Sequence, residues 1–210
     1  MVGEFKNGGR EWRKSKDPVL VKSHDFPEKD VAKAVPYGIY DLANNEGWVS
    51  VGITHDTAEF AAESIYRWWS EMGKKRYPKA ESLMIMADSG GSNGVRNKLW
   101  KVTLQKLSDA IGLNLHVSLF PSGTSKWNRI EHRLFCFVAN NWRGKPLTSY
   151  QVIVNLIAST TNKKGLKVKA ALDTNVYETG IEVTEEQLRK VNIHRDDFHG
   201  DWNYIISPSG

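Results

Sequence analysis

Cysteine is almost absent from this chain of 210 residues, where Cys136 stands alone. A single thiol cannot form an internal disulfide framework, and it excludes a zinc site built from several thiolates. Long apolar stretches are also missing, since no run approaches the roughly 18 residues that a membrane helix needs. No charged leader followed by an apolar stretch opens the chain. The sequence therefore predicts a soluble, cytoplasmic protein with no membrane partner.

Acidic residues are outnumbered, with 24 aspartates and glutamates against 29 lysines and arginines, which gives a formal charge of +5. This excess favours an acidic partner without establishing one, because many basic proteins bind no nucleic acid. The basic residues gather in three clusters, at residues 6–16, 74–76 and 163–169. Taken singly, each cluster is also compatible with a solvated face or loop.

Glycine and proline residues, together with the spacing of apolar residues, divide the first half of the chain into segments. Residues 1–36 are interrupted by glycine and proline, and we interpret them as a short strand followed by a loop-rich excursion. Residues 37–42 and 48–53 flank a glycine-containing turn and predict a hairpin. A helix follows, with Asp56 as its expected N-cap and Gly73 as its expected left-handed terminator. Its apolar stripe consists of Ala61, Ile65, Trp68 and Met72.

Strands and helices alternate in the second half. The apolar residues 83–87 predict a central strand buried on both faces, and the alternating residues 113–119 predict a strand with one buried face. Between them, residues 95–111 predict a helix that ends at Gly112. The remaining expected elements are a third helix with Ile130, Leu134, Phe137 and Val138 inward, a helix at about 149–160, a strand near 166–172, a small helix opened by the capping box of Thr184 and Gln187, and a polar loop at 194–201.

A hairpin followed by alternating strands and helices is typical of an α/β domain with a mixed sheet. We therefore expect one main domain over residues 37–162. Residues 1–36 would form a strand remnant with a loop-rich insertion, and residues 163–210 a C-terminal extension that packs on the core.

Asp88 is the first candidate for a functional residue. It ends the most apolar strand, and the Gly-, Ser- and Asn-rich residues 89–94 permit close approach of a ligand. In α/β sheets, functional groups collect at the carboxyl ends of the strands. The alternative is a carboxylate that only ends its strand or caps the next helix.

Glu131 is the second candidate, at the edge of the apolar stripe of the third helix. Asn128 lies three positions earlier and would share the same surface. Lys126, Arg129 and Arg133 surround the pair with positive charge. The alternative is a surface carboxylate in ion pairs with these cations.

Two such carboxylates can share Mg²⁺, which prefers oxygen ligands and keeps several waters. Two ions roughly 4 Å apart can stabilise the attacking and leaving oxygens of a phosphoryl displacement, and nearby cations would hold the phosphodiester. Trp127 either stacks on a base or packs in the core. Other chemistries fit less well, because the residues after Asp88 lack a P-loop lysine and Ser89 lies outside a G-x-S-x-G elbow.

Two segments carry a resemblance to a known family. They are residues 86–94, Met-Ala-Asp-Ser-Gly-Gly-Ser-Asn-Gly, and residues 120–135, of which Lys-Trp-Asn-x-x-Glu-His at 126–132 is the specific part. They resemble the DDE transposases of bacterial insertion sequences, and more narrowly the Rhodopirellula-type transposase group. The likeness continues through residues 7–12, 37–42, 140–144 and 198–204, and it covers essentially the whole chain.

The resemblance implies a ribonuclease H-like mixed sheet flanked by helices, and Mg²⁺-dependent cutting and joining of transposon ends, with Mn²⁺ as a substitute. By position, Asp88 is similar to the second acidic residue of that family, Glu131 to the third and Asn128 to the polar residue before it. The implied partners are transposon ends and target DNA, on which the chain would assemble as a homo-oligomer in the nucleoid. The expected DNA contacts are Lys126, Trp127, Arg129 and Lys98.

The first aspartate of that family, carried on its opening strand, has no counterpart in this chain. Glu4 lies past the expected position, and Asp41 is a poor substitute because an Asp beside a turn usually serves the turn. We therefore expect an incomplete first strand and impaired activity, and a sheet edge left open to self-association. Two alternatives remain, namely a non-catalytic DNA-binding remnant and an α/β protein whose acidic pair is structural.

Overall fold

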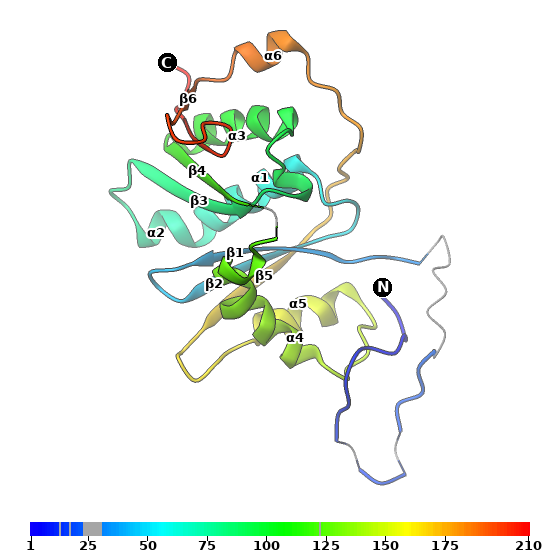
Figure 1. Cartoon of the computed structure of the whole chain (residues 1–210). Helices are drawn as coiled ribbons and strands as arrows, with labels where there is room; N and C mark the ends of the chain where they lie inside the picture. The colour runs from blue at the N-terminus through cyan, green and yellow to red at the C-terminus, as the bar shows by residue number, and fades with distance from the viewer. Residues whose placement is uncertain (13, 17, 23–30, 122) are drawn as a thin grey trace. The chain divides into compact units, whose positions relative to one another are not determined.

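The computed structural model (Figure 1) is a mixed α/β structure, as the sequence predicted. Its strands are divided between two mixed sheets, and helices flank both of them. No helix in the described part of the chain is long and apolar enough to cross a membrane. The structure describes residues 1–12, 14–16, 18–22, 31–121 and 123–210.

The chain forms two compact units, each built from two separate stretches of sequence. The first unit contains Met1–Thr54 and Arg129–Val176, and the second contains His55–Asn128 and Tyr177–Gly210. The division expected at residues 36/37 and 162/163 stays a prediction.

The first unit contains a three-stranded sheet in the order β1-β2-β5. The expected hairpin is confirmed, because β1 (Val35–Asp41) pairs antiparallel with β2 (Glu46–Gly52). Strand β5 (Lys167–Asp173) then pairs parallel with β2. The helical elements of this unit are η4 (Glu131–Phe135), α4 (Cys136–Trp142) and α5 (Tyr150–Ala158).

Two glycines let the helical segment η4 approach the hairpin closely. A Cβ atom at Gly38 would lie 2.6 Å from Cζ of Phe135, and one at Gly47 would lie 2.7 Å from Cδ1 of Leu134. Both distances are below ordinary contact, so larger residues on the strands would push the helix away. Leu134, Val49 and other buried aliphatic side chains form the core of this unit. The segment that begins at Glu131 is thereby fixed against β1 and β2.

The second unit contains a four-stranded sheet in the order β3-β4-β7-β6. Strand β3 (Ser82–Asp88) pairs parallel with β4 (Asn114–Phe120), and α3 (Lys98–Ile111) connects them. The alternation expected for residues 113–119 is confirmed, since Leu115, Val117 and Leu119 are buried. The other helical elements are α1 (Ala58–Trp68), η1 (Trp69–Gly73), α2 (Lys74–Arg76), η2 (Gly91–Asn93), η3 (Ser125–Trp127) and α6 (Glu185–Arg189).

The helix beginning at α1 differs from the prediction at both ends. Its N-cap is Thr57, whose hydroxyl accepts from the amide of Phe60 at 3.2 Å, so the assignment of Asp56 was wrong by one residue. Gly73 is right-handed, with φ −62°, and the helix continues past it. A Cβ at Gly73 would lie 2.5 Å from the ring of Trp69, so this glycine serves packing rather than termination. Gly112 does end α3 in the left-handed region, at φ 69°, as expected.

Strand β3 is an edge strand, and the expectation that both of its faces are buried was wrong. It pairs with β4 alone among the described strands, and 57 % of Met84 and 43 % of Met86 are exposed. A continuous apolar run indicates burial on both faces only when strands and helices surround it.

The polar loop expected at residues 194–201 is largely confirmed, but its first two residues belong to a strand and the loop closes a hairpin. Strands β6 (Ile193–Arg195) and β7 (Asn203–Ile206) form an antiparallel hairpin, and β7 joins the sheet beside β4. The capping box at Thr184 is confirmed, because its hydroxyl accepts from the amide of Gln187 while the Gln187 side chain accepts from the amide of Thr184.

Candidate active site

Asp88 is exposed at the carboxyl end of β3, as the sequence predicted. Its partner in the neighbouring strand is Phe120, the last residue of β4. Parallel strands end at the same edge of a sheet, where ligands of α/β folds commonly bind. The segments that follow both strands therefore begin beside Asp88.

The segment after β3 is held by side chains that bind its carbonyl oxygens. The Asn97 side chain donates to the carbonyl of Ser92 at 2.9 Å and also accepts from the amide of Trp100 at 3.2 Å. Gly91 has a φ of 61°, and Oδ2 of Asp56 is 3.8 Å from where its Cβ would lie. Asp56 thus places a second carboxylate near the turn that follows Asp88.

Lys101 is a third group at this segment, and the sequence analysis missed it. It is only 7 % exposed, and its Nζ donates to the carbonyl of Val95 at 2.8 Å and lies 5.8 Å from the ring centroid of Tyr204. Burial lowers the pKa of Lys101, and the nearby charge of Arg195 lowers it further. A hydrophobic stripe cannot reveal a buried lysine, because its period counts apolar residues only.

The segment after β4 brings three of the predicted residues together in the same unit as Asp88. Trp127 is 58 % exposed, which favours an open stacking surface over a core position. Nζ of Lys126 lies 5.9 Å from the Trp127 ring centroid, within cation–π range. Asn128 is 8 % exposed and lies just before the helical segment rather than on it, which corrects the expected placement.

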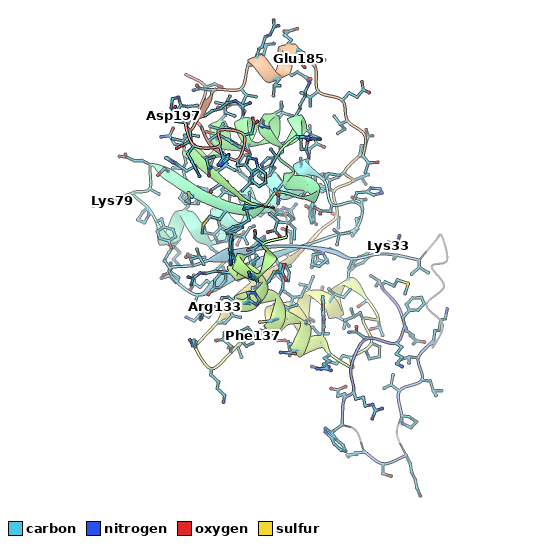
Figure 2. All side chains as sticks on the ribbon, in the orientation of Figure 1. Lys33, Lys79, Arg133, Phe137, Glu185 and Asp197 are labelled. Carbon is cyan, nitrogen blue, oxygen red and sulfur yellow. The ribbon has the colours of Figure 1, made fainter. Side chains whose placement is uncertain are left out.

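Glu131 belongs to the other unit and is the first residue of the π-helical turn η4. The amide of Cys136 donates to the Glu131 carbonyl five residues earlier, and the Glu131 side chain is exposed. Turns of this kind are rare in proteins, and those that occur often lie at functional sites. The expected inward stripe is confirmed, since Leu134 and Val138 are buried and Ile130 and Phe137 pack against the same core. Arg133 and Phe137 are labelled in Figure 2. Arg129 is exposed in the same unit.

Lys98, another predicted DNA contact, forms an ion pair with Glu185 of α6, and Glu185 is labelled in Figure 2. This lysine lowers the pKa of Glu185 through the hydrogen bond and through its charge. A phosphate would have to compete with Glu185 for Lys98.

Asp41 accepts from the amides of Ala43 and Asn44 at 2.9 and 3.1 Å, so it stabilises the hairpin turn, as expected.

The residue types at Asp88 and Glu131 suit a magnesium ion, which binds carboxylate oxygens and keeps several waters. Within the residues that the structure describes, no group of three or more His, Cys, Asp and Glu side chains could hold a metal ion.

A mixed α/β domain with an acidic residue at a strand end is consistent with a ribonuclease H-like domain of the DDE type. The chain belongs to the Rhodopirellula transposase DDE domain family, whose model matches residues 1–208. No curated protein matches the chain, and no solved structure matches it. The family confirms the resemblance found in the sequence, supports a transposase function and implies that the chain binds DNA.

Proposed function

We propose that this chain is the catalytic domain of a transposase that cuts and joins DNA ends by metal-dependent phosphoryl transfer, with Asp88 and Glu131 as metal ligands. The observation that carries the proposal is the match to a DDE transposase family over nearly the whole chain. The position of Asp88 at the end of β3 and the π turn that begins at Glu131 support it.

The chemistry of the two side chains fits a divalent cation. Both carboxylates are exposed, so their oxygens are accessible to an ion and its waters. When bound, a pair of Mg²⁺ ions would stabilise the attacking and leaving oxygens of the phosphodiester, and no nucleophilic side chain is then required. The proposal requires Asp88 and Glu131 to act on one shared site in the working protein.

The neighbouring residues of the chain would bind and orient DNA. The ammonium of Lys126 and the guanidinium of Arg129, both exposed, would neutralise phosphates. The exposed ring of Trp127 offers a face on which a base can stack. Asn128, which is 8 % exposed, would support this surface from next to Trp127 in the chain rather than contact DNA directly.

A second candidate function is that of a DNA-binding remnant without catalysis. It is favoured by the lack of a three-ligand group among the described residues. Under the leading proposal, two carboxylates hold an ion more weakly than three, so we expect impaired activity. Under the second, the basic surface persists and the carboxylates bind no metal.

Calorimetric titration with Mn²⁺ separates the two functions, and it is the first test of the proposal. We expect binding heat from the wild-type chain, and its loss in both Asp88→Asn and Glu131→Gln, because each removes a charged ligand. Asp197→Asn, an exposed carboxylate of the C-terminal hairpin, is the matched control and should keep the heat. The absence of heat from the wild type, with DNA binding intact, would establish the remnant.

A strand-cleavage assay with Mg²⁺ or Mn²⁺ tests the expected impairment. We expect at most slow cutting of a DNA duplex by the wild-type chain. Robust turnover that disappears in Asp88→Asn would contradict the impairment while supporting the assignment of Asp88.

A further inference from the structure

The first unit carries a groove where two distant segments meet. The arm, meaning the described residues 6–12, 14–16 and 18–22, packs against residues 144–146 between α4 and α5. The two segments enclose a groove of about 490 Å³, here called the arm groove. None of the residues predicted for the active site lines it.

The arm is fixed to this connection by hydrogen bonds and a close backbone crossing. The Asn7 side chain donates to the carbonyl of Trp142 at 2.9 Å, and the amide of Gly144 donates to the carbonyl of Gly8 at 2.8 Å. A Cβ at Gly144 would lie 2.7 Å from the backbone carbon of Arg10, so only glycine permits the crossing. The part of the arm around residues 7–10 is therefore fixed against the connection between α4 and α5.

The lining of the arm groove combines cations with an apolar surface. Its charged lining residues are the exposed Lys6, Lys14, Lys16 and Glu11, and its apolar ones include Val19, Val21 and Pro146. Lys6, Lys14 and Lys16 all line the same concavity. A lining that combines lysines with apolar side chains suits a sugar–phosphate backbone, whose phosphates are charged and whose sugar rings are not.

The backbone of Lys16 adds an independent observation. Its φ is 71°, in the left-handed region that glycine and asparagine adopt more readily than lysine does. Lys16 therefore occupies a turn position that glycine or asparagine would adopt with less strain. Strain of this kind is found at sites where the side chain has a role.

We propose that the arm groove binds the phosphodiester backbone of duplex DNA, through Lys6, Lys14 and Lys16. This surface is additional to the residues around Asp88, and it rests on the proposed function only in that the partner is DNA. The arm would hold the duplex by charge, without reading its sequence, because lysines on phosphates carry no base information.

The test compares two triple variants that remove the same charge. Lys6→Ala/Lys14→Ala/Lys16→Ala alters the arm groove, and Lys163→Ala/Lys164→Ala/Lys167→Ala alters an exposed cluster of the same unit. Binding to a duplex of about 20 base pairs of arbitrary sequence is measured as a function of salt. For the groove variant, the magnitude of the slope of log K against log salt should fall by about 3, since each lost phosphate contact contributes about 0.9. Its affinity at low salt should drop about tenfold or more.

The control triple should keep nearly the wild-type slope and affinity. Equal losses in both variants would show that net charge alone governs binding, and they would overturn the arm groove as a site. An unchanged groove variant would overturn it as well. Thermal unfolding of both variants verifies that each is folded.

A single substitution separates binding from folding at the turn. Lys16→Asn places a residue better suited to φ 71° at that position, so stability should stay equal or rise while DNA affinity falls severalfold. A variant that binds DNA as tightly as the wild type would contradict a role for Lys16.

The outcome is independent of the metal centre. All binding is measured in EDTA, so a failure of the groove variants leaves the Mn²⁺ titration of Asp88 and Glu131 unaffected. Conversely, a chain without Mn²⁺ heat can still show the groove-dependent slope.

Discussion

At the scale of single residues, the burial of Tyr204 makes the stability of the fold depend on pH. Its ring is 3 % exposed, and burial raises the pKa of its hydroxyl far above the ordinary value of about 10. The folded state therefore keeps a proton that the unfolded state releases above pH 10. The contribution of this raised pKa to the free energy of unfolding is fully present below about pH 10. Above that pH it is lost, by about 1.4 kcal/mol per pH unit.

Tyr204→Phe should remove this alkaline loss, because phenylalanine keeps the ring and has no proton to release. We expect the variant to lose less stability than the wild type between about pH 10 and 12 in urea unfolding. The lowered pKa of Lys101 makes stability rise with pH instead, and it is present in both proteins. The difference between their stability–pH profiles therefore reports Tyr204 alone. Tyr66→Phe, at a 41 % exposed site, is the control. Parallel profiles for Tyr204→Phe and the wild type would contradict the argument.

At the scale of elements, a hydrogen bond from a side chain of α3 holds the segment between Asp88 and that helix in place. Lys101 binds the carbonyl of Val95 from a nearly buried position. Lys101→Met keeps the length of the side chain and removes this hydrogen bond, which as a charged bond is worth about 1.5–3 kcal/mol. We expect the amides of residues 92–97 to exchange hydrogen about tenfold faster or more in the variant.

Lys106→Met, on the exposed side of the same helix, provides the control for that experiment. It should leave exchange in residues 92–97 at the wild-type rate. If both variants gave the same exchange rates, Lys101 would have no positioning role toward this segment.

The elements that the sequence predicted correctly have local signals. The hairpin, the buried stripe at Leu134 and Val138, the end of α3 at Gly112 and the capping box at Thr184 each follow from residues within one or two turns of chain. Periodicity and cap chemistry decide such features before any tertiary contact forms.

The elements that it missed depend on distant neighbours. Strand β7 lies among polar residues and is recruited by β4, about 90 positions earlier in the chain. Gly73 is shaped by the ring of Trp69, which occupies the space of a side chain. For the candidate site, the position of Asp88 followed from its strand, whereas Lys101 was missed because its partner is a backbone carbonyl. The roles of Asp88 and Glu131 stay predictions.

At the scale of the whole molecule, the four sheet edges in the described part of the chain are protected unequally. Natural edges carry proline, charged residues or short strands, which discourage pairing with other chains. Strand β1 contains Pro36, β5 contains Lys167 and Lys169, and β6 is three residues long. Strand β3 has none of these devices before Asp88, and two of its methionines are exposed. Among the edges of the two described sheets, β3 therefore has the weakest protection.

Strand β3 should accordingly promote self-association of the chain. In sedimentation velocity, we expect the weight-average mass of the wild type to rise with concentration. Met86→Lys should reduce this rise, because a lysine on the strand makes pairing with a second copy bury a charge. Val176→Lys adds the same charge at a 75 % exposed site outside the strands and should leave the association unchanged. A wild-type chain that stays monomeric at high concentration would show that β3 is protected in solution, and equal effects of both lysines would assign the association to net charge rather than to this edge.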